Sequence, residues 1–89
     1  SIMISKQEKE HIINNHKHTL LWYDRINKKL WLSYNHNQID NYIKDVLLAT
    51  SLHDCIKTGN NYYFYNRQEN IKITINSHSY SVITVDRIK

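Results

Sequence analysis

The last twenty residues of the chain carry a two-residue period of apolar and polar side chains. Ile71, Ile73 and Ile75 alternate with polar residues, which is the pattern of a β-strand with one buried face. A polar turn at residues 76–79 and a second β-prone run at residues 80–85 follow. Because two strands alone are only marginally stable in water, the rest of the chain must cover this hairpin. We therefore expect the three isoleucines to belong to the core.

Three helices are predicted ahead of these strands. Ser followed three residues later by Glu is a capping box, and it predicts a helix over residues 6–15. Thr19 is the predicted N-cap of a second helix that continues to about Leu30, because its apolar residues gather on one face at helical spacing. A second capping box, formed by Asn and Gln, predicts a third helix over residues 36–50.

Beyond the third helix the hydrophobic period changes from helical to two. A short strand is expected at residues 54–57, a turn around Gly59, and an aromatic strand at residues 62–65 ahead of the terminal hairpin. Helices grouped before strands predict an α+β fold. In this fold, three N-terminal helices pack on one face of a C-terminal three- or four-stranded antiparallel meander.

The length of 89 residues suits one small domain with one hydrophobic core. We expect its helical part at residues 5–50 and its sheet part at residues 54–87. Residues 1–4 precede the first capping box, so we expect them to be disordered or left over from expression, with Met3 as the natural start. A hydrophobic content of 40% and seven Tyr indicate a folded chain.

The last predicted strand does not alternate cleanly. Tyr80 and Val82 fall on one face, whereas Ile83 and Val85 fall on the other. Either the strand is buried on both sides, or a β-bulge switches its register near Val82. If the strand is central in the sheet, a second copy of the chain would cover its outward face, and a homodimer is the expectation in that case.

Composition excludes several classes of protein. The single Cys55 cannot form an internal disulfide, and we expect it to be a small, inert strand residue. The chain lacks an apolar run of roughly 20 residues and a signal-peptide pattern, so we expect a cytoplasmic protein with no membrane partner. No sequence pattern indicates a cofactor. The net charge of +4 is modestly basic, and it is compatible with a nucleic acid or an acidic protein as partner.

Two distinctive stretches are YDRINKKL at residues 23–30 and KITINSHSYSVITVDR at residues 72–87. Together they resemble a small bacterial family known as domain of unknown function 3781. Its members are similar in reading Y-x-R-I-N-K-K-L on an early helix and R-I-T-I-N-S-x-x-Y-R-V-I-T-V-D near the end. The resemblance spans roughly residues 12–89, and the chain departs from it at Lys72 and Ser81, where the family often has Arg. It implies a family but no activity.

The six His of the chain raise the question of a metal site. His11, His16 and His18 are the densest group, and His16 and His18 can converge in a turn. No Cys or carboxylate follows at a convincing ligand spacing, and no HExxH helix is present. We therefore favour surface histidines, and we assign no metal ligand.

Basic residues interleaved with aromatic residues on the predicted sheet are candidate binding residues. Because strand side chains alternate, either Tyr62 with Phe64 or Tyr63 with Tyr65 faces outward. Outward rings stack on the bases of RNA or single-stranded DNA while cations meet the phosphates. A tyrosine-rich face that lies under the helices is the alternative. The candidate binding residues, from the sheet and from the basic side of the second helix, are Arg25, Lys28, Lys29, Arg67, Lys72, His78, Tyr80 and Arg87.

The leading hypothesis is a small non-enzymatic binding module of bacterial or phage origin. It would engage a protein or a nucleic acid through the outer sheet face and the basic side of the second helix, and an inhibitor of host defence belongs to this class. We assign no catalytic residue. The alternative is a RelE-like endoribonuclease toxin that cleaves mRNA. Its candidate residues, acting as acid, base and phosphate stabilisers, would be Arg67, His78, Tyr80 and Arg87.

Overall fold

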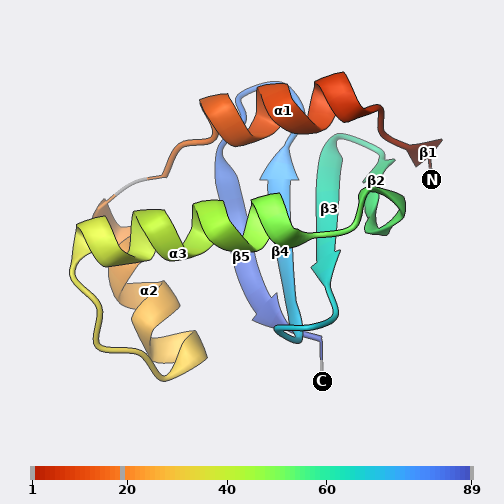
Figure 1. Cartoon of the computed structure of the whole chain (residues 1–89). Helices are drawn as coiled ribbons and strands as arrows, with labels where there is room; N and C mark the ends of the chain where they lie inside the picture. The colour runs from red at the N-terminus through yellow and green to blue at the C-terminus, as the bar shows by residue number, and fades with distance from the viewer. Residues whose placement is uncertain (1, 19, 89) are drawn as a thin grey trace.

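The computed structural model describes residues 2–18 and 20–88 and shows three helices packed on a sheet (Figure 1). The fold is α+β, as predicted, but the antiparallel sheet has five strands where three or four were expected. The elements in chain order are β1 (Ile2–Met3), α1 (Lys6–Asn15), α2 (Leu20–Leu30), α3 (His36–Ala49), a single 3-10 turn (Leu52–Asp54), β2 (Cys55–Thr58), β3 (Asn61–Asn66), β4 (Ile71–Asn76) and β5 (Val82–Arg87).

Two of the helices begin at the predicted capping boxes. Ser5 Oγ accepts from the Glu8 backbone N–H at 3.1 Å, and the Ser5 N–H donates back to Glu8 Oε1 at 3.2 Å. Asn35 and Gln38 make the same reciprocal pair at 2.8 and 2.9 Å ahead of α3. Each box satisfies two backbone donors that the first helical turn leaves free. The predicted N-cap of α2, Thr19, lies outside the described residues.

The helices cover one face of the sheet, whose strands lie in the order of the chain, β1 to β5. In Figure 1, α1 and α3 cross in front of the strands, and α2 lies beside the lower part of β5. Gly59 makes the β2–β3 turn with a φ of +60°, the left-handed region that glycine adopts without steric cost. The strand residues that face the helices are buried: Cys55, Tyr62, Phe64, Ile71, Ile73, Ile75, Val82 and Val85.

Residues 2–4, for which we expected disorder or an origin in expression, lie along β2 at the edge of the sheet. Ile2 and Met3 pair with Lys57 and Ile56 of β2. The Ile4 N–H donates to Cys55 O at 3.2 Å, and the Ile4 side chain is only 3% exposed. Burial of the Ile4 side chain stabilises the packing of these first residues on the sheet.

The last strand contains the β-bulge that its pattern suggested. Thr74 pairs with Thr84 but Ile75 pairs with Val82, so Ile83 is an extra residue between them. Val82 is buried on the helix side, and Ile83 is 44% exposed. Within the described residues β5 is the last strand of the sheet. The condition that we attached to a homodimer, a central last strand, is therefore not met.

One cluster of buried residues joins the helices to the inner sheet face. Ile12 and Ile13 come from α1, Ile26 from α2, and Ile39 and Ile43 from α3. Neither α1, α2 nor α3, nor the 3-10 turn, is long and apolar enough to cross a lipid bilayer, taking the residues that the structure describes. The open face of the sheet, opposite this cluster, is where side chains remain available for a partner.

Candidate functional site

Tyrosines and cations occupy the sheet face opposite the helices. Tyr62 and Phe64 are buried toward the helices, so Tyr63 and Tyr65 are the outward pair. The register places Lys72 directly opposite Tyr65 on the neighbouring strand. Alternation along β3 and β4 therefore decides between the two outward pairs that the sequence left open.

Each outward ring has a cation above it. Lys72 Nζ lies 5.9 Å from the centroid of the Tyr63 ring, and Arg67 Cζ lies 5.5 Å from that of Tyr65. The two rings lie 6.4 Å apart at an interplanar angle of 28°. Such cation–π contacts contribute roughly 0.5–1 kcal/mol each at exposed sites. We call Tyr63, Tyr65, Arg67 and Lys72 the tyrosine–cation face.

An ion pair at the β5 edge connects this face to α2. Asp86 lies opposite Lys72 in the register, and its carboxylate accepts from Lys29 Nζ at 2.8 Å and from the Thr84 hydroxyl at 2.8 Å. The hydrogen bond from Lys29 lowers the pKa of the Asp86 carboxyl below its ordinary value. Because Lys29 comes from α2 on the helix side, this pair passes around the edge of the sheet.

A family model described as "Protein of unknown function (DUF3781)" matches residues 7–86. The chain belongs to the DUF3781 family. This match confirms the family that the two sequence stretches resemble. Comparisons with curated proteins and with solved structures each gave no significant match. What this DUF3781 chain does must therefore be argued from its own residues.

The α2 cations of this DUF3781 chain lie on the helix side of the sheet, next to β5. Arg25 and Lys29 line a hollow of about 260 Å³ between α2 and β5, whose floor includes Ile26 and Ile83. Over residues 2–18 and 20–88, the ion pairs include Lys29 but neither Arg25 nor Lys28. The exposed charges of Arg25 and Lys28 are thus available to an acidic partner.

The remaining predicted binding residues are divided between the two ends of the sheet. His78 lies in the β4–β5 turn, where its N–H donates to Asn76 Oδ1 at 2.9 Å. Tyr80 is half-buried, and its ring stacks on Tyr62 at 6.4 Å. Arg87 lies at the other end of β5, opposite Ile71, and its guanidinium donates to Leu30 O at 3.3 Å at the end of α2. A strand of six residues, about 20 Å, separates the two ends.

This separation bears on the toxin alternative. Arg67 and Arg87 cannot act on the same phosphodiester as His78 and Tyr80, because acid–base catalysis requires hydrogen-bond reach of the reacting atoms. The ring of Tyr80 also packs against His11 at 5.0 Å between centroids, on the helix side. The four candidate catalytic residues therefore do not form one site.

The three histidines of the N-terminal part have separate environments. His11 packs on Tyr80, and His16 Nδ1 lies 2.7 Å from Ile13 O. Burial lowers the pKa of His16. His18 Nε2 lies 2.5 Å from Asp40 Oδ1 on α3. Over the part of the chain that the structure describes, no group of three His, Cys, Asp or Glu is placed to hold a metal ion.

A polar cluster that no sequence pattern predicted joins His18 to Tyr23 and Asp40. Tyr23 Oη donates to Asp40 Oδ1 at 2.7 Å and lies 2.6 Å from His18 Nε2. Burial and the hydrogen bond to Asp40 raise the pKa of Tyr23 to about 12. Trp22 and His36 stack on this cluster from either side, at 4.2 Å from His18 and 4.0 Å from Tyr23. Its members join the link between α1 and α2 to both α2 and α3.

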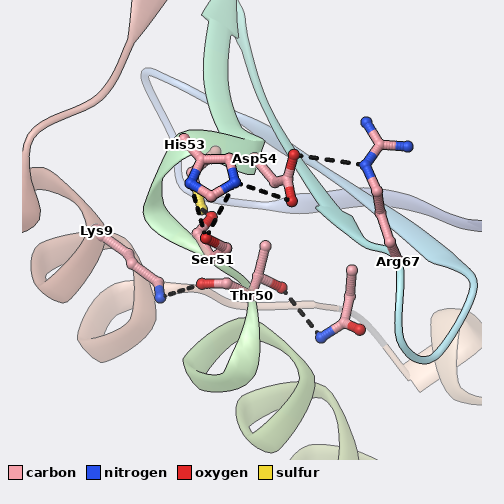
Figure 2. Close-up of polar contacts among 8 residues, drawn as sticks. Lys9, Thr50, Ser51, His53, Asp54 and Arg67 are labelled. Carbon is pink, nitrogen blue, oxygen red and sulfur yellow. Dashed lines mark hydrogen bonds and ion pairs between the residues drawn. The ribbon is translucent and has the colours of Figure 1, made fainter.

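A second polar group surrounds the 3-10 turn (Figure 2). Ser51 Oγ lies 3.0 Å from His53 Nδ1 and 3.4 Å from its Nε2, and His53 Nε2 is 4.0 Å from Asp54 Oδ2. In a serine hydrolase the serine contacts Nε2 and the carboxylate accepts from Nδ1. Here the serine lies nearer Nδ1, and the carboxylate is 4.0 Å from Nε2, beyond hydrogen-bond distance. Arg67 Nε donates to Asp54 Oδ1 at 3.4 Å, so this group anchors the tyrosine–cation face at its base.

Cys55 is fully buried beside this group, and burial raises the pKa of its thiol to about 11. A nucleophilic cysteine needs a lowered pKa and access to solvent. The thiol donates weakly to Ser51 O at 3.4 Å. Cys55 has neither property, and it packs in the core as a residue of β2.

Proposed function

We propose that the chain is a small binding module that holds a single-stranded nucleic acid on its tyrosine–cation face. The observation that carries the proposal is the pair Tyr63 and Tyr65, side by side on the middle strand, with Lys72 and Arg67 above their rings. Aromatic rings on an open sheet stack nucleobases, and adjacent cations contact phosphates.

The charge distribution supports this proposal. The chain carries a net charge of +4, and Arg25 and Lys28 place exposed cations on α2, next to the β5 edge of the sheet. Two acidic residues adjoin this face, and both are engaged: Asp86 by Lys29 and Thr84, and Asp54 by Arg67. A backbone-directed, sequence-tolerant interaction with modest affinity follows from such a surface.

Two other hypotheses compete with this one. A protein partner would also use exposed Tyr and Arg, which are enriched in interface hot spots. The two outward rings favour a nucleic acid as partner, because successive bases of a strand can each stack on one ring. The endoribonuclease hypothesis has less support, because His78 and Tyr80 lie far from Arg67 and Arg87. A bacterial or phage origin, a cytoplasmic location and a role against host defence remain part of the proposal.

Fluorescence anisotropy with a labelled twelve-nucleotide oligouridine tests the proposal. Binding should weaken as salt rises, since phosphate contacts release counterions. Tyr63→Ala and Tyr65→Ala should each weaken binding about tenfold, because one stacked base contributes roughly 1–3 kcal/mol. The control is Tyr34→Ala, which removes an exposed ring from the α2–α3 link and should leave the affinity unchanged.

Several outcomes would contradict the proposal. An affinity that does not change with salt, or that both tyrosine variants retain, would exclude this face as a nucleic-acid site. Recovery of one stoichiometric protein, without oligonucleotide binding, would assign the surface to a protein partner. RNA cleavage that disappears in His78→Ala or Arg67→Ala would instead favour the toxin.

A further inference from the structure

Trp31 occupies a position where a large side chain is unusual. It follows α2 directly, has a φ of +56°, and is 83% exposed. The Leu32 N–H donates to Asn27 O at 2.8 Å, which is the six-to-one bond of a Schellman motif. The left-handed residue in this motif is usually Gly, because a Cβ is unfavourable there. A tryptophan held in this conformation in open solvent calls for a reason outside the helix itself.

The surroundings of Trp31 hold its ring in place. Arg87 Cζ lies 4.5 Å from the ring centroid, and Arg87 Nη2 donates to Leu30 O at 3.3 Å. Just beyond, the side chain of Asn27 binds the Tyr34 backbone twice, at 3.1 and 2.9 Å. The indole is therefore fixed on one side by a cation and open to solvent over most of its surface.

A continuous row of side chains leads from the tyrosine–cation face to this ring. Tyr65 lies opposite Lys72, and Lys72 lies opposite Asp86. These two steps span two strand spacings, about 10 Å. Asp86 then pairs with Lys29, two residues before Trp31, and Arg87 follows Asp86 along β5. Cations and rings thus succeed one another from the outer face, around the β5 edge, to the end of α2.

We infer that Trp31 and Arg87 form a third stacking position for the same single-stranded nucleic acid. This inference rests on the proposed function and extends its site. One base stacks on the open surface of the indole, and the linking phosphates pass the ammonium of Lys29 and the guanidinium of Arg87. A dinucleotide covers the two tyrosines alone, whereas a longer strand reaches the tryptophan.

Trp31 itself reports on this contact, because the chain has only two tryptophans and Trp22 is buried. In Trp22→Phe, all tryptophan emission comes from Trp31. The twelve-nucleotide oligouridine should quench that emission, and the dinucleotide UpU should not. If Trp22→Phe does not fold, the difference between the emission spectra of the unmodified chain and of Trp31→Phe gives the same signal.

Affinity measurements complete the test. Trp31→Ala should weaken binding of the twelve-nucleotide strand about tenfold and leave UpU unaffected, and Trp31→Phe should retain most of the affinity. Leu48→Ala, which removes another exposed apolar side chain at the end of α3, is the matched control and should change neither affinity.

The outcomes separate this inference from the proposed function. If the long strand binds through Tyr63 and Tyr65 but neither quenches Trp31 nor responds to Trp31→Ala, the inference is overturned and the proposed function stands. If the strand does not bind at all, both are overturned. If Trp31→Ala instead abolishes binding of a protein partner and leaves the oligonucleotide affinity intact, the tryptophan belongs to a protein interface and the inference fails.

Discussion

Val82 and Val85 lie three positions apart on β5, and yet both side chains face the core. An unbroken strand would send them to opposite faces, since strand side chains alternate. Ile83 is an extra residue in a bulge opposite Ile75 and Thr74, and it brings the side chains of Val82 and Val85 onto the same face. The bulge therefore lets the strand bury two valines and still present Thr84 and Asp86 on the outer face.

Deletion of Ile83 tests this relationship. Without Ile83, Val82 and Val85 are two positions apart, so an unbroken strand keeps both valines in the core. We expect this deletion to lower the free energy of unfolding, measured by urea denaturation, by less than the roughly 1.5–3 kcal/mol that full burial of a valine contributes. Deletion of both Ile83 and Thr84 makes the two valines neighbours, so one must leave the core and the loss should reach about 1.5–3 kcal/mol. Ile83→Thr, which keeps the bulge and changes only an exposed side chain, should stay within about 0.5 kcal/mol of the unmodified chain. Equal effects of the single and the double deletion would contradict the register of β5.

The ammonium of Lys9 caps the end of α3. Lys9 Nζ donates to Leu48 O at 3.2 Å and to Thr50 O at 2.5 Å, as Figure 2 shows for Thr50. A cation is favourable at a helix C-terminus, where carbonyls lack partners. We expect Lys9→Met to lower the free energy of unfolding by about 1 kcal/mol, and Lys9→Arg to retain part of it. Lys44→Met, on the exposed side of α3, is the control; an equal loss there would exclude a capping role.

The ion pair of Lys29 and Asp86 should make stability depend on pH in the acid range. The pKa of Asp86 is lowered from 3.8 in the folded chain, so the unfolded chain binds its proton first as pH falls. The stabilisation is present above pH 3.8 and is lost as pH falls through the lower, folded pKa. Because both side chains are partly exposed, we expect about 0.2–1 kcal/mol.

Urea denaturation between pH 2 and pH 6 measures this contribution. Asp86→Asn and Lys29→Met should both flatten the acid limb of the stability curve, and high salt should do the same. A curve for Asp86→Asn with the same slope as that of the unmodified chain would show that Asp86 is not stabilised in its charged form.

The left-handed backbone at Trp31 leads to a comparison of two substitutions. Trp31→Gly and Trp31→Ala both remove the ring and its contact with Arg87, but only glycine also removes the unfavourable Cβ. We expect the glycine variant to be more stable than the alanine variant by about 1 kcal/mol, the usual cost of this conformation. Thermal unfolding of the two variants measures the difference. If the alanine variant were the more stable one, the Schellman geometry at the end of α2 would be wrong.

The features that the sequence predicted depend on residues close together in the chain. The capping boxes at Ser5 and Asn35 join residues three apart, so they place the starts of α1 and α3 correctly. The alternation of Ile71, Ile73 and Ile75 gives the buried face of β4 in the same way. The broken alternation near Val82 also carried enough information to suggest the bulge.

The features that were missed depend on partners far apart in the chain. β1 is only two residues long, and its strand character comes from β2 more than fifty positions later. Lys29 and Asp86 are separated by 57 positions, and His18 and Asp40 by 22. The two-residue period of β3 left two possible outward pairs, Tyr62 with Phe64 or Tyr63 with Tyr65. Only the packing of the helices on one face of the sheet decided between them. Patterns among residues close together in the sequence do not predict such contacts.

The strand order has a consequence for how the sheet assembles. From β3 to β5 every strand pairs with the one just before it in the chain, so these pairings close short loops at a small entropic cost. β1 is different, because its pairing with β2 must close a loop that contains all three helices. Proteins rich in local contacts fold quickly. We therefore expect the four-strand meander to form early and the amides of β1 to exchange first, as the least protected part of the sheet.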